Sequence, residues 1–84
     1  MGKGEKRLAQ MRNNPKDDWQ IADIEAVCRA YDIKLVPPSG GSHWSVYHER
    51  AGIQTIPAHR RIKVRYIKEF VRFVENVTGE SHDS

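Results

Sequence analysis

Cysteine is almost absent from this sequence, because Cys28 is the only one among 84 residues. A single cysteine excludes a disulfide within the chain and any zinc cluster built from several thiolates. The four histidines show no metal-ligand spacing such as H-x-x-x-H. We therefore expect a reducing compartment and a protein that needs no metal and no other cofactor.

Long hydrophobic runs are also missing. No stretch approaches the ~20 apolar residues that a membrane-spanning helix needs, and the polar N-terminus has no signal-peptide hydrophobic segment. We expect a cytoplasmic protein without a membrane contact. The composition suits one globular domain, because 38% of the residues are hydrophobic and 30% are charged.

Negative charge is scarce in one region, although the net charge of the chain is only +3. Residues 1–36 carry seven Lys or Arg and six Asp or Glu, whereas residues 57–72 carry six basic residues and one acidic residue, Glu69. Such a local excess of positive charge favours an acidic partner, of which nucleic acid is the commonest. A solvated helix face is the alternative explanation for the same charges.

Hydrophobic periodicity predicts an α+β fold. The pattern predicts six elements in the order helix, helix, strand, strand, strand, helix, over residues 3–13, 21–31, 33–36, 43–48, 53–56 and 63–77. Short connections make the three strands an antiparallel sheet. Each of the two long helices has one apolar stripe, so we expect both helices on one face of the sheet and the other face open to water.

Alternation within residues 43–48 predicts which side chains reach the open face. The more apolar set is expected to face the helices and consists of Trp44, Val46 and His48. The more polar set is expected on the open face and consists of His43, Ser45 and Tyr47. Aromatic side chains can stack on the bases of single strands, and for that role we expect Tyr47 rather than Trp44.

The chemically most informative stretch is the loop Gly40-Gly41-Ser42, which leads directly into His43. A histidine can accept or donate a proton near neutral pH. Glycines let a ligand backbone come close, and free N–H groups in such a loop can hold a phosphate oxygen. These features suit metal-free RNA cleavage, in which the ribose 2′-OH attacks its own phosphate and needs a proton acceptor. A histidine after a turn is, however, also common as a plain surface residue.

A second histidine, His59, follows the third predicted strand in the stretch IPAHRRIK. Because the second and third strands are neighbours, we expect this stretch to approach the sheet edge near His43. The cations around it would neutralise an RNA phosphate and are Arg60, Arg61, Lys63 and Arg65. The remaining candidates for RNA contact are Gly41, Ser42, Ser45 and Tyr47. A basic loop that only improves solubility is the alternative interpretation.

These features together resemble the HicA family, the toxins of HicAB toxin–antitoxin systems. The likeness covers residues 21–75 and includes the element order, the GGSHW turn into the second strand, and TIPAHRRIKVRYIKEFVRFVE from the third strand onward. Its most specific element is Gly41-Ser42-His43. The second is Pro57-Ala58-His59, which basic residues and an amphipathic helix follow.

The resemblance implies a double-stranded-RNA-binding-domain-like fold and a metal-independent endoribonuclease that cleaves mRNA. It also implies a HicB-like antitoxin partner that covers the active site. The family's catalytic histidine falls on His43. The chain departs from the family's pattern in a longer segment before Ile21, and in Trp44, where many members have another histidine or a smaller residue.

On this interpretation the chain comprises an N-terminal extension with a short helix (residues 1–20), a HicA-like domain (residues 21–78) and a flexible tail (residues 79–84). The residues leave two other functions open. One is a non-catalytic module that binds double-stranded RNA through its backbone charge, with His43 as a contact alone. The other is a protein-interaction domain whose basic face docks an acidic partner.

Overall fold

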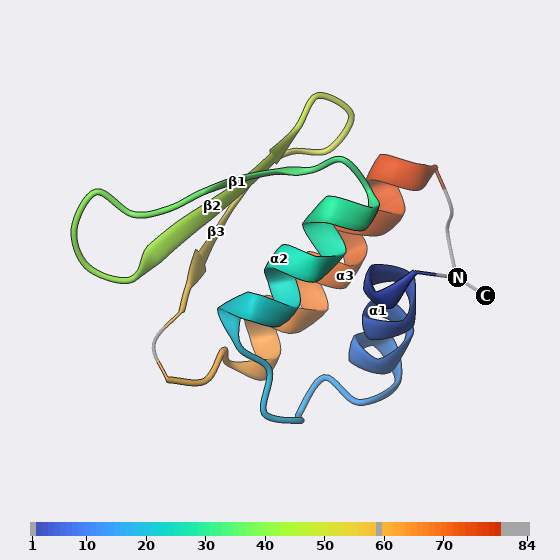
Figure 1. Cartoon of the computed structure of the whole chain (residues 1–84), viewed down its shortest axis with the longest axis horizontal. Helices are drawn as coiled ribbons and strands as arrows, with labels where there is room; N and C mark the ends of the chain where they lie inside the picture. The colour runs from blue at the N-terminus through green and yellow to red at the C-terminus, as the bar shows by residue number, and fades with distance from the viewer. Residues whose placement is uncertain (1, 59, 80–84) are drawn as a thin grey trace.

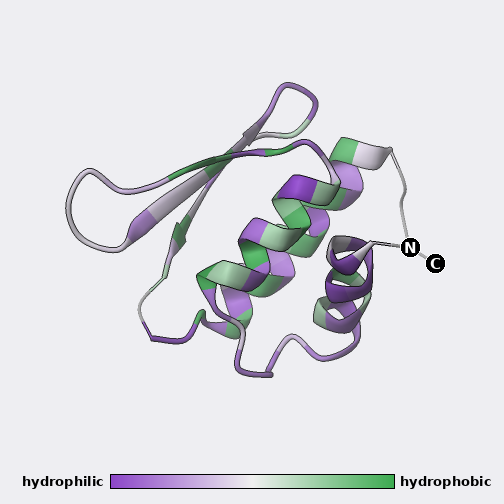
Figure 2. Cartoon of the chain, viewed as in Figure 1, coloured by the Kyte–Doolittle hydropathy of each residue, from purple (hydrophilic) through white to green (hydrophobic). Residues whose placement is uncertain are grey.

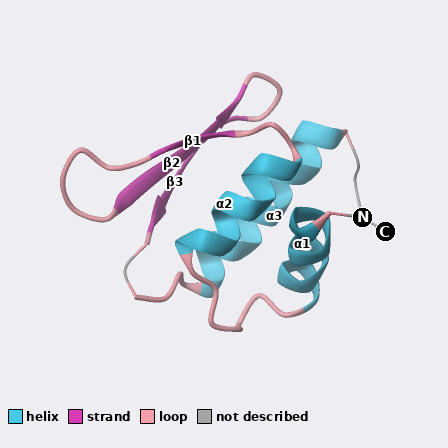
Figure 3. Cartoon of the chain, in the orientation of Figure 1, coloured by secondary structure: helices cyan, strands magenta, loops and turns pink. Residues whose placement is uncertain are grey.

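The computed structural model describes residues 2–58 and 60–79 of the chain. Its elements, drawn in Figures 1 and 3, are α1 (Lys3–Asn13), α2 (Ile21–Ala30), β1 (Lys34–Val36), β2 (His43–His48), β3 (Gly52–Pro57) and α3 (Val64–Thr78). The predicted α+β class and element order are confirmed. Each predicted end lies within one residue of the observed one.

The three strands form an antiparallel sheet in the order β1-β2-β3. In the central strand, Tyr47 lies opposite Lys34 of β1 and Ile53 of β3, and His43 lies opposite Pro57. Side chains directly opposite each other in a sheet point to the same face. The register therefore fixes which residues of the three strands share each face.

Helices α2 and α3 lie side by side against one face of the sheet, and α1 lies beyond them on the side away from the sheet (Figure 1). The layers meet in one core, to which the sheet contributes the fully buried Val46 and Ile56. In Figure 2, hydrophobic and hydrophilic residues alternate along α2 and α3, as expected for helices buried on one side. The opposite face of the sheet carries no helix among the described residues (Figure 1).

Helix α1 is part of this core. Leu8 and Met11 are buried against α2 and α3. Gly4 allows the close approach of α1 to α2, because a Cβ at this position would lie 2.4 Å from the Cβ of Ala30. An ion pair joins α1 to each neighbouring helix, Arg7 to Asp23 at 3.2 Å and Arg12 to Glu75 at 3.1 Å.

Two tryptophans differ in their structural roles. Trp19 precedes α2 and is buried, and its indole N–H donates a hydrogen bond to the Asn14 carbonyl at 2.9 Å. Trp44 shares the inner face of the sheet with Val46, as predicted, but it is only half buried and does not belong to the buried cluster. The expectation that Trp44 faces the helices is therefore correct, although its side chain is only partly buried.

Candidate nucleic-acid interface

One face of the sheet carries no helix from the part of the chain that the structure describes, and it is called here the open sheet face. By register and alternation its side chains are those of Lys34, Val36, His43, Ser45, Tyr47, Ile53, Thr55 and Pro57. The described chain exposes three large hydrophobic side chains, and all three lie on this face: Val36 (40% exposed), Tyr47 (45%) and Ile53 (69%). None of the eight residues is acidic. The face therefore combines apolar surface with a mildly positive charge, which suits a nucleic acid.

His43 is the first residue of β2 and is exposed on the open sheet face. The loop before it leaves room for a ligand, because no atom lies within 4 Å of where a Cβ would stand at Gly40 or Gly41. Gly41 has a φ of +89°, which favours glycine. The expected position of His43, Ser45 and Tyr47 on the outer face agrees with the register.

The basic segment after β3, residues 58–63, is held by two backbone hydrogen bonds, the first to the glycine loop and the second to the residues before α2. The N–H of Ala58 donates to the Ser42 carbonyl at 2.8 Å, and the N–H of Ile62 donates to the Trp19 carbonyl at 2.9 Å. Arg60 and Arg61 lie between these bonds and are exposed. The first bond involves the residue next to His43, so the basic segment begins beside His43. In Figure 2 the segment between β3 and α3 includes a hydrophilic stretch.

The other predicted contacts separate into two groups. Lys63 is exposed and precedes the first turn of α3, so it continues the basic segment. Arg65 lies within α3, where its guanidinium is 3.7 Å from a Glu69 carboxylate oxygen and 5.6 Å from the centre of the Tyr66 ring. Arg65 therefore belongs to the helix surface and not to the open sheet face. His59 lies outside the described residues, and its approach to His43 stays a prediction.

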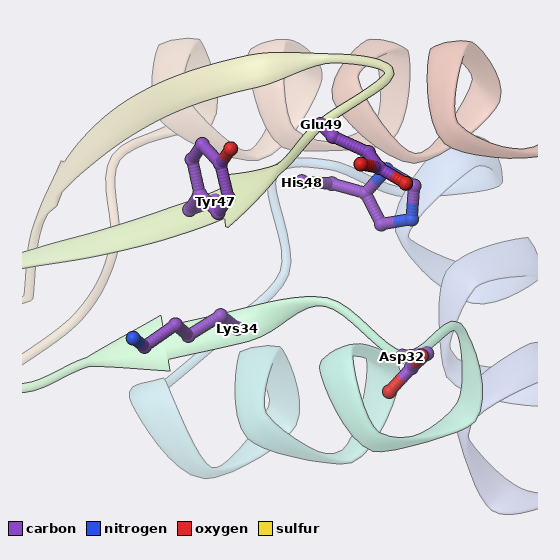
Figure 4. A pocket seen from close by; sticks show the side chains of 5 residues that line it. All are labelled: Asp32, Lys34, Tyr47, His48 and Glu49. Carbon is purple, nitrogen blue, oxygen red and sulfur yellow. The ribbon is translucent and has the colours of Figure 1, made fainter.

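A cleft lies at the end of the sheet away from His43 and is shown in Figure 4. It has a volume of about 260 Å³ and is lined by Asp32, Lys34, Tyr47, His48 and Glu49. Sequence reasoning identified Tyr47 but missed its neighbours. Lys34 could have been identified from the sequence, because a meander pairs the start of β1 with the end of β2. Asp32 could not be identified in this way, because its position depends on its own left-handed backbone conformation, with a φ of 57°.

The described residues contain neither a metal-binding group nor a membrane-spanning helix. No group of three or more His, Cys, Asp or Glu in residues 2–58 and 60–79 has an arrangement that would hold a metal ion. No helix in that part of the chain is long and apolar enough to cross a membrane. Comparison of the chain with protein-family models, curated proteins and solved structures gave no match. The case for a function therefore depends on the geometry and on the motifs.

Proposed function

We propose that this protein is a metal-independent endoribonuclease that cleaves mRNA, with His43 as its general acid and base. The observation that carries the proposal is the position of His43 on the open sheet face, which has no carboxylate. On one side of His43 is the glycine loop, which leaves space for a ligand, and on the other begins the basic segment that hydrogen bonds hold in place. An accessible proton acceptor accelerates attack by the ribose 2′-OH, and cations beside it bind the RNA backbone. The motifs shared with the HicA family support the same conclusion.

The reaction follows from the chemistry of RNA. His43 accepts the proton of a ribose 2′-OH, whose oxygen forms a bond to the adjacent phosphorus while the bond to the 5′ oxygen of the next nucleotide breaks. The leaving 5′ oxygen takes a proton, either from the protonated His43 or from water. The products are a 2′,3′-cyclic phosphate and a 5′-hydroxyl. Arg60, Arg61 and Lys63 would neutralise the phosphate charge that develops.

We also propose that the protein is the toxin of a type II toxin–antitoxin system in the cytoplasm. A HicB-like antitoxin would neutralise the toxin by covering the open sheet face and His43. The apolar side chains exposed there, Val36, Tyr47 and Ile53, favour burial by a protein partner when the enzyme is inactive.

The test is to express the wild-type chain and His43→Ala without an antitoxin, and to follow growth and total RNA. We expect the wild type to stop growth and degrade mRNA, and His43→Ala to do neither while its circular dichroism stays unchanged. His82→Ala is the matched control and should behave as the wild type. With purified protein, EDTA should leave cleavage intact. Normal cleavage by His43→Ala would refute the proposal.

The second candidate is a non-catalytic RNA-binding module. One observation favours it. Among the described residues, His43 is the single histidine on the open sheet face beside the glycine loop. The state of the RNA separates the two functions. A binding module retards RNA in a native gel and leaves it whole, whereas the nuclease produces fragments with cyclic phosphate ends.

A further inference from the structure

We propose that the cleft at the far end of the open sheet face binds one unpaired base of the RNA and prefers bases that carry an exocyclic amino group. The inference rests on the proposed function, because it concerns recognition of the same RNA that His43 would cleave. The cleft is formed by the end of β2, the start of β1 and the residues beside them (Figure 4).

Tyr47 provides the surface on which a base can stack. The residue is 45% exposed and lies in a row across the sheet, between Lys34 on β1 and Ile53 on β3. An exposed aromatic ring on a sheet face is a common platform for single-stranded RNA, because every base has a flat face that can stack on it. Ile53 widens this platform with an aliphatic surface.

The size of the cleft limits what can occupy it. Its volume of about 260 Å³ lies just below the ~300–1,000 Å³ that is typical of sites for drug-sized ligands. A single ring system fits this space. A duplex turns the edges of its bases inward, so an unpaired base is the form of RNA that the cleft can accept.

The polar side chains of the cleft match the edge of an amino-bearing base. No hydrogen bond or ion pair within residues 2–58 and 60–79 occupies the side chains of Asp32, Lys34 or Glu49. Carboxylates only accept hydrogen bonds, and amino groups of bases donate them. Guanine is the expected base, because its N–H and amino groups can both donate to one carboxylate. Uracil has no amino group.

The fourth polar side chain, His48, has a fixed orientation. Its Nδ1 accepts a hydrogen bond from the N–H of Arg50 at 3.1 Å. In the neutral ring the proton is therefore on Nε2, so His48 adds a donor to the cleft and not a second acceptor. The cleft thus offers the carboxylates of Asp32 and Glu49 as acceptors and the ring N–H of His48 as a donor.

The charge of the whole open sheet face favours an RNA strand over a cationic segment of a protein, because that face carries Lys34 and no carboxylate. His43 and Tyr47 are four residues apart on one strand, which is ~13 Å. One RNA strand that lies along β2 can therefore reach both, with the recognised base and the cleaved phosphate in different nucleotides.

The experiment measures binding with the full chain carrying His43→Ala, so that the RNA is not cut. The probes are uridine heptamers whose central base is G, C, A or U, and a matched RNA duplex. We expect the heptamer with G to bind about tenfold more tightly than the all-U heptamer, and C and A to fall between them. The duplex should bind more weakly than any heptamer with an amino-bearing base.

Second-site variants in this background locate the effect. Asp32→Asn and Glu49→Gln should remove the base preference, and asparagine tolerates the left-handed backbone of residue 32. Tyr47→Ala should weaken all heptamers about tenfold, whereas Tyr47→Phe should not. Asp18→Asn is the matched control, because Asp18 precedes α2 and Asp32 follows it, ~15 Å of helix away.

Three outcomes would overturn the inference. Equal binding of all four heptamers would refute base recognition and leave the proposed nuclease standing. Preference that survives both carboxylate variants would place recognition elsewhere. If the two variants instead lose binding of an arginine-rich peptide and bind RNA unchanged, the cleft is a peptide site. Failure of the protein to bind any RNA would refute the proposed function itself, which is a different result from the loss of preference.

Discussion

The carbonyl oxygen of Ser42 accepts a hydrogen bond from the backbone N–H of Ala58 at 2.8 Å. Ser42 precedes β2 and Ala58 follows β3, so this bond extends the β2–β3 pairing beyond the ladder, whose last pair is His43 with Pro57. It brings the start of the basic segment beside the glycine loop. Two stretches that are 16 positions apart in the sequence thereby form one surface around His43.

The first prediction concerns the charge of that surface. Arg60→Gln together with Arg61→Gln should weaken RNA binding and lower the slope of log K against log salt by about one to two, because each arginine that contacts a phosphate releases a counterion. The control removes two charges of the same sign from α1, with Lys3→Gln and Lys6→Gln on the side of the molecule away from the sheet. If both double variants change the slope equally, net charge alone governs binding.

The second prediction concerns the two glycines of the loop. Gly41 has a φ of +89°, whereas Gly40 has no such φ, and both have open space where a Cβ would stand. Gly41→Ala should therefore destabilise the fold by about 1–2 kcal/mol through backbone strain, and Gly40→Ala should change stability by less than about 0.5 kcal/mol. Urea unfolding followed by tryptophan fluorescence measures both. Equal stability of the two variants would show that the loop adjusts its backbone freely.

How much of this architecture the sequence predicts depends on the range of the interaction. The ends of α1 and β2 were predicted to the residue, because Pro15 and the glycine pair act on their immediate neighbours. Strand β3 is one residue longer at each end than predicted, because Gly52 and Pro57 pair across the sheet with His48 and His43. The outward direction of His43 and Tyr47 followed from alternation alone.

Two features that join distant segments were not predicted. The carbonyl of Trp19 accepts from Ile62 across 43 positions of sequence, and no local pattern indicates this bond. The cleft is a similar case, since Asp32, Lys34 and Glu49 meet Tyr47 only once the sheet has formed. The direction of Trp44 was foreseen from alternation, whereas its partial burial depends on how far the helices extend over the sheet.

The third prediction tests the close packing of α1 on α2. A Cβ at Gly4 would lie 2.4 Å from the Cβ of Ala30 and 2.5 Å from the carbonyl oxygen of Ala26, which is backbone and cannot move alone. Gly4→Ala should therefore destabilise the fold by about 1–3 kcal/mol, although alanine favours a helix over glycine by about 1 kcal/mol. Chemical denaturation is the measurement.

Gly2→Ala is the matched control for that experiment. Its Cβ would approach the Glu5 carboxylate at 2.6 Å, and this flexible side chain can move away. We expect a change of less than about 0.5 kcal/mol. Ala30→Gly in the Gly4→Ala background should restore part of the lost stability by removing one of the two contacts. A Gly4→Ala variant as stable as the wild type would show that α1 does not pack closely on α2.

The last prediction concerns Cys28, which is 2% exposed on the inner side of α2. Burial, and secondly the negative charge of Glu25, raise the pKa of the Cys28 thiol from 9.0 to about 12. The folded chain thus binds more protons than the unfolded chain between these two values, so folding stability should fall as the pH rises above about 9. Cys28→Ala removes this contribution, and its stability should fall less between pH 8 and 10 than that of the wild type.

At pH 8 the native thiol should react with iodoacetamide far more slowly than the thiol in urea, because the thiolate is the reactive form. Equal rates in the two conditions, or identical pH slopes for the two chains, would contradict the burial of this thiol.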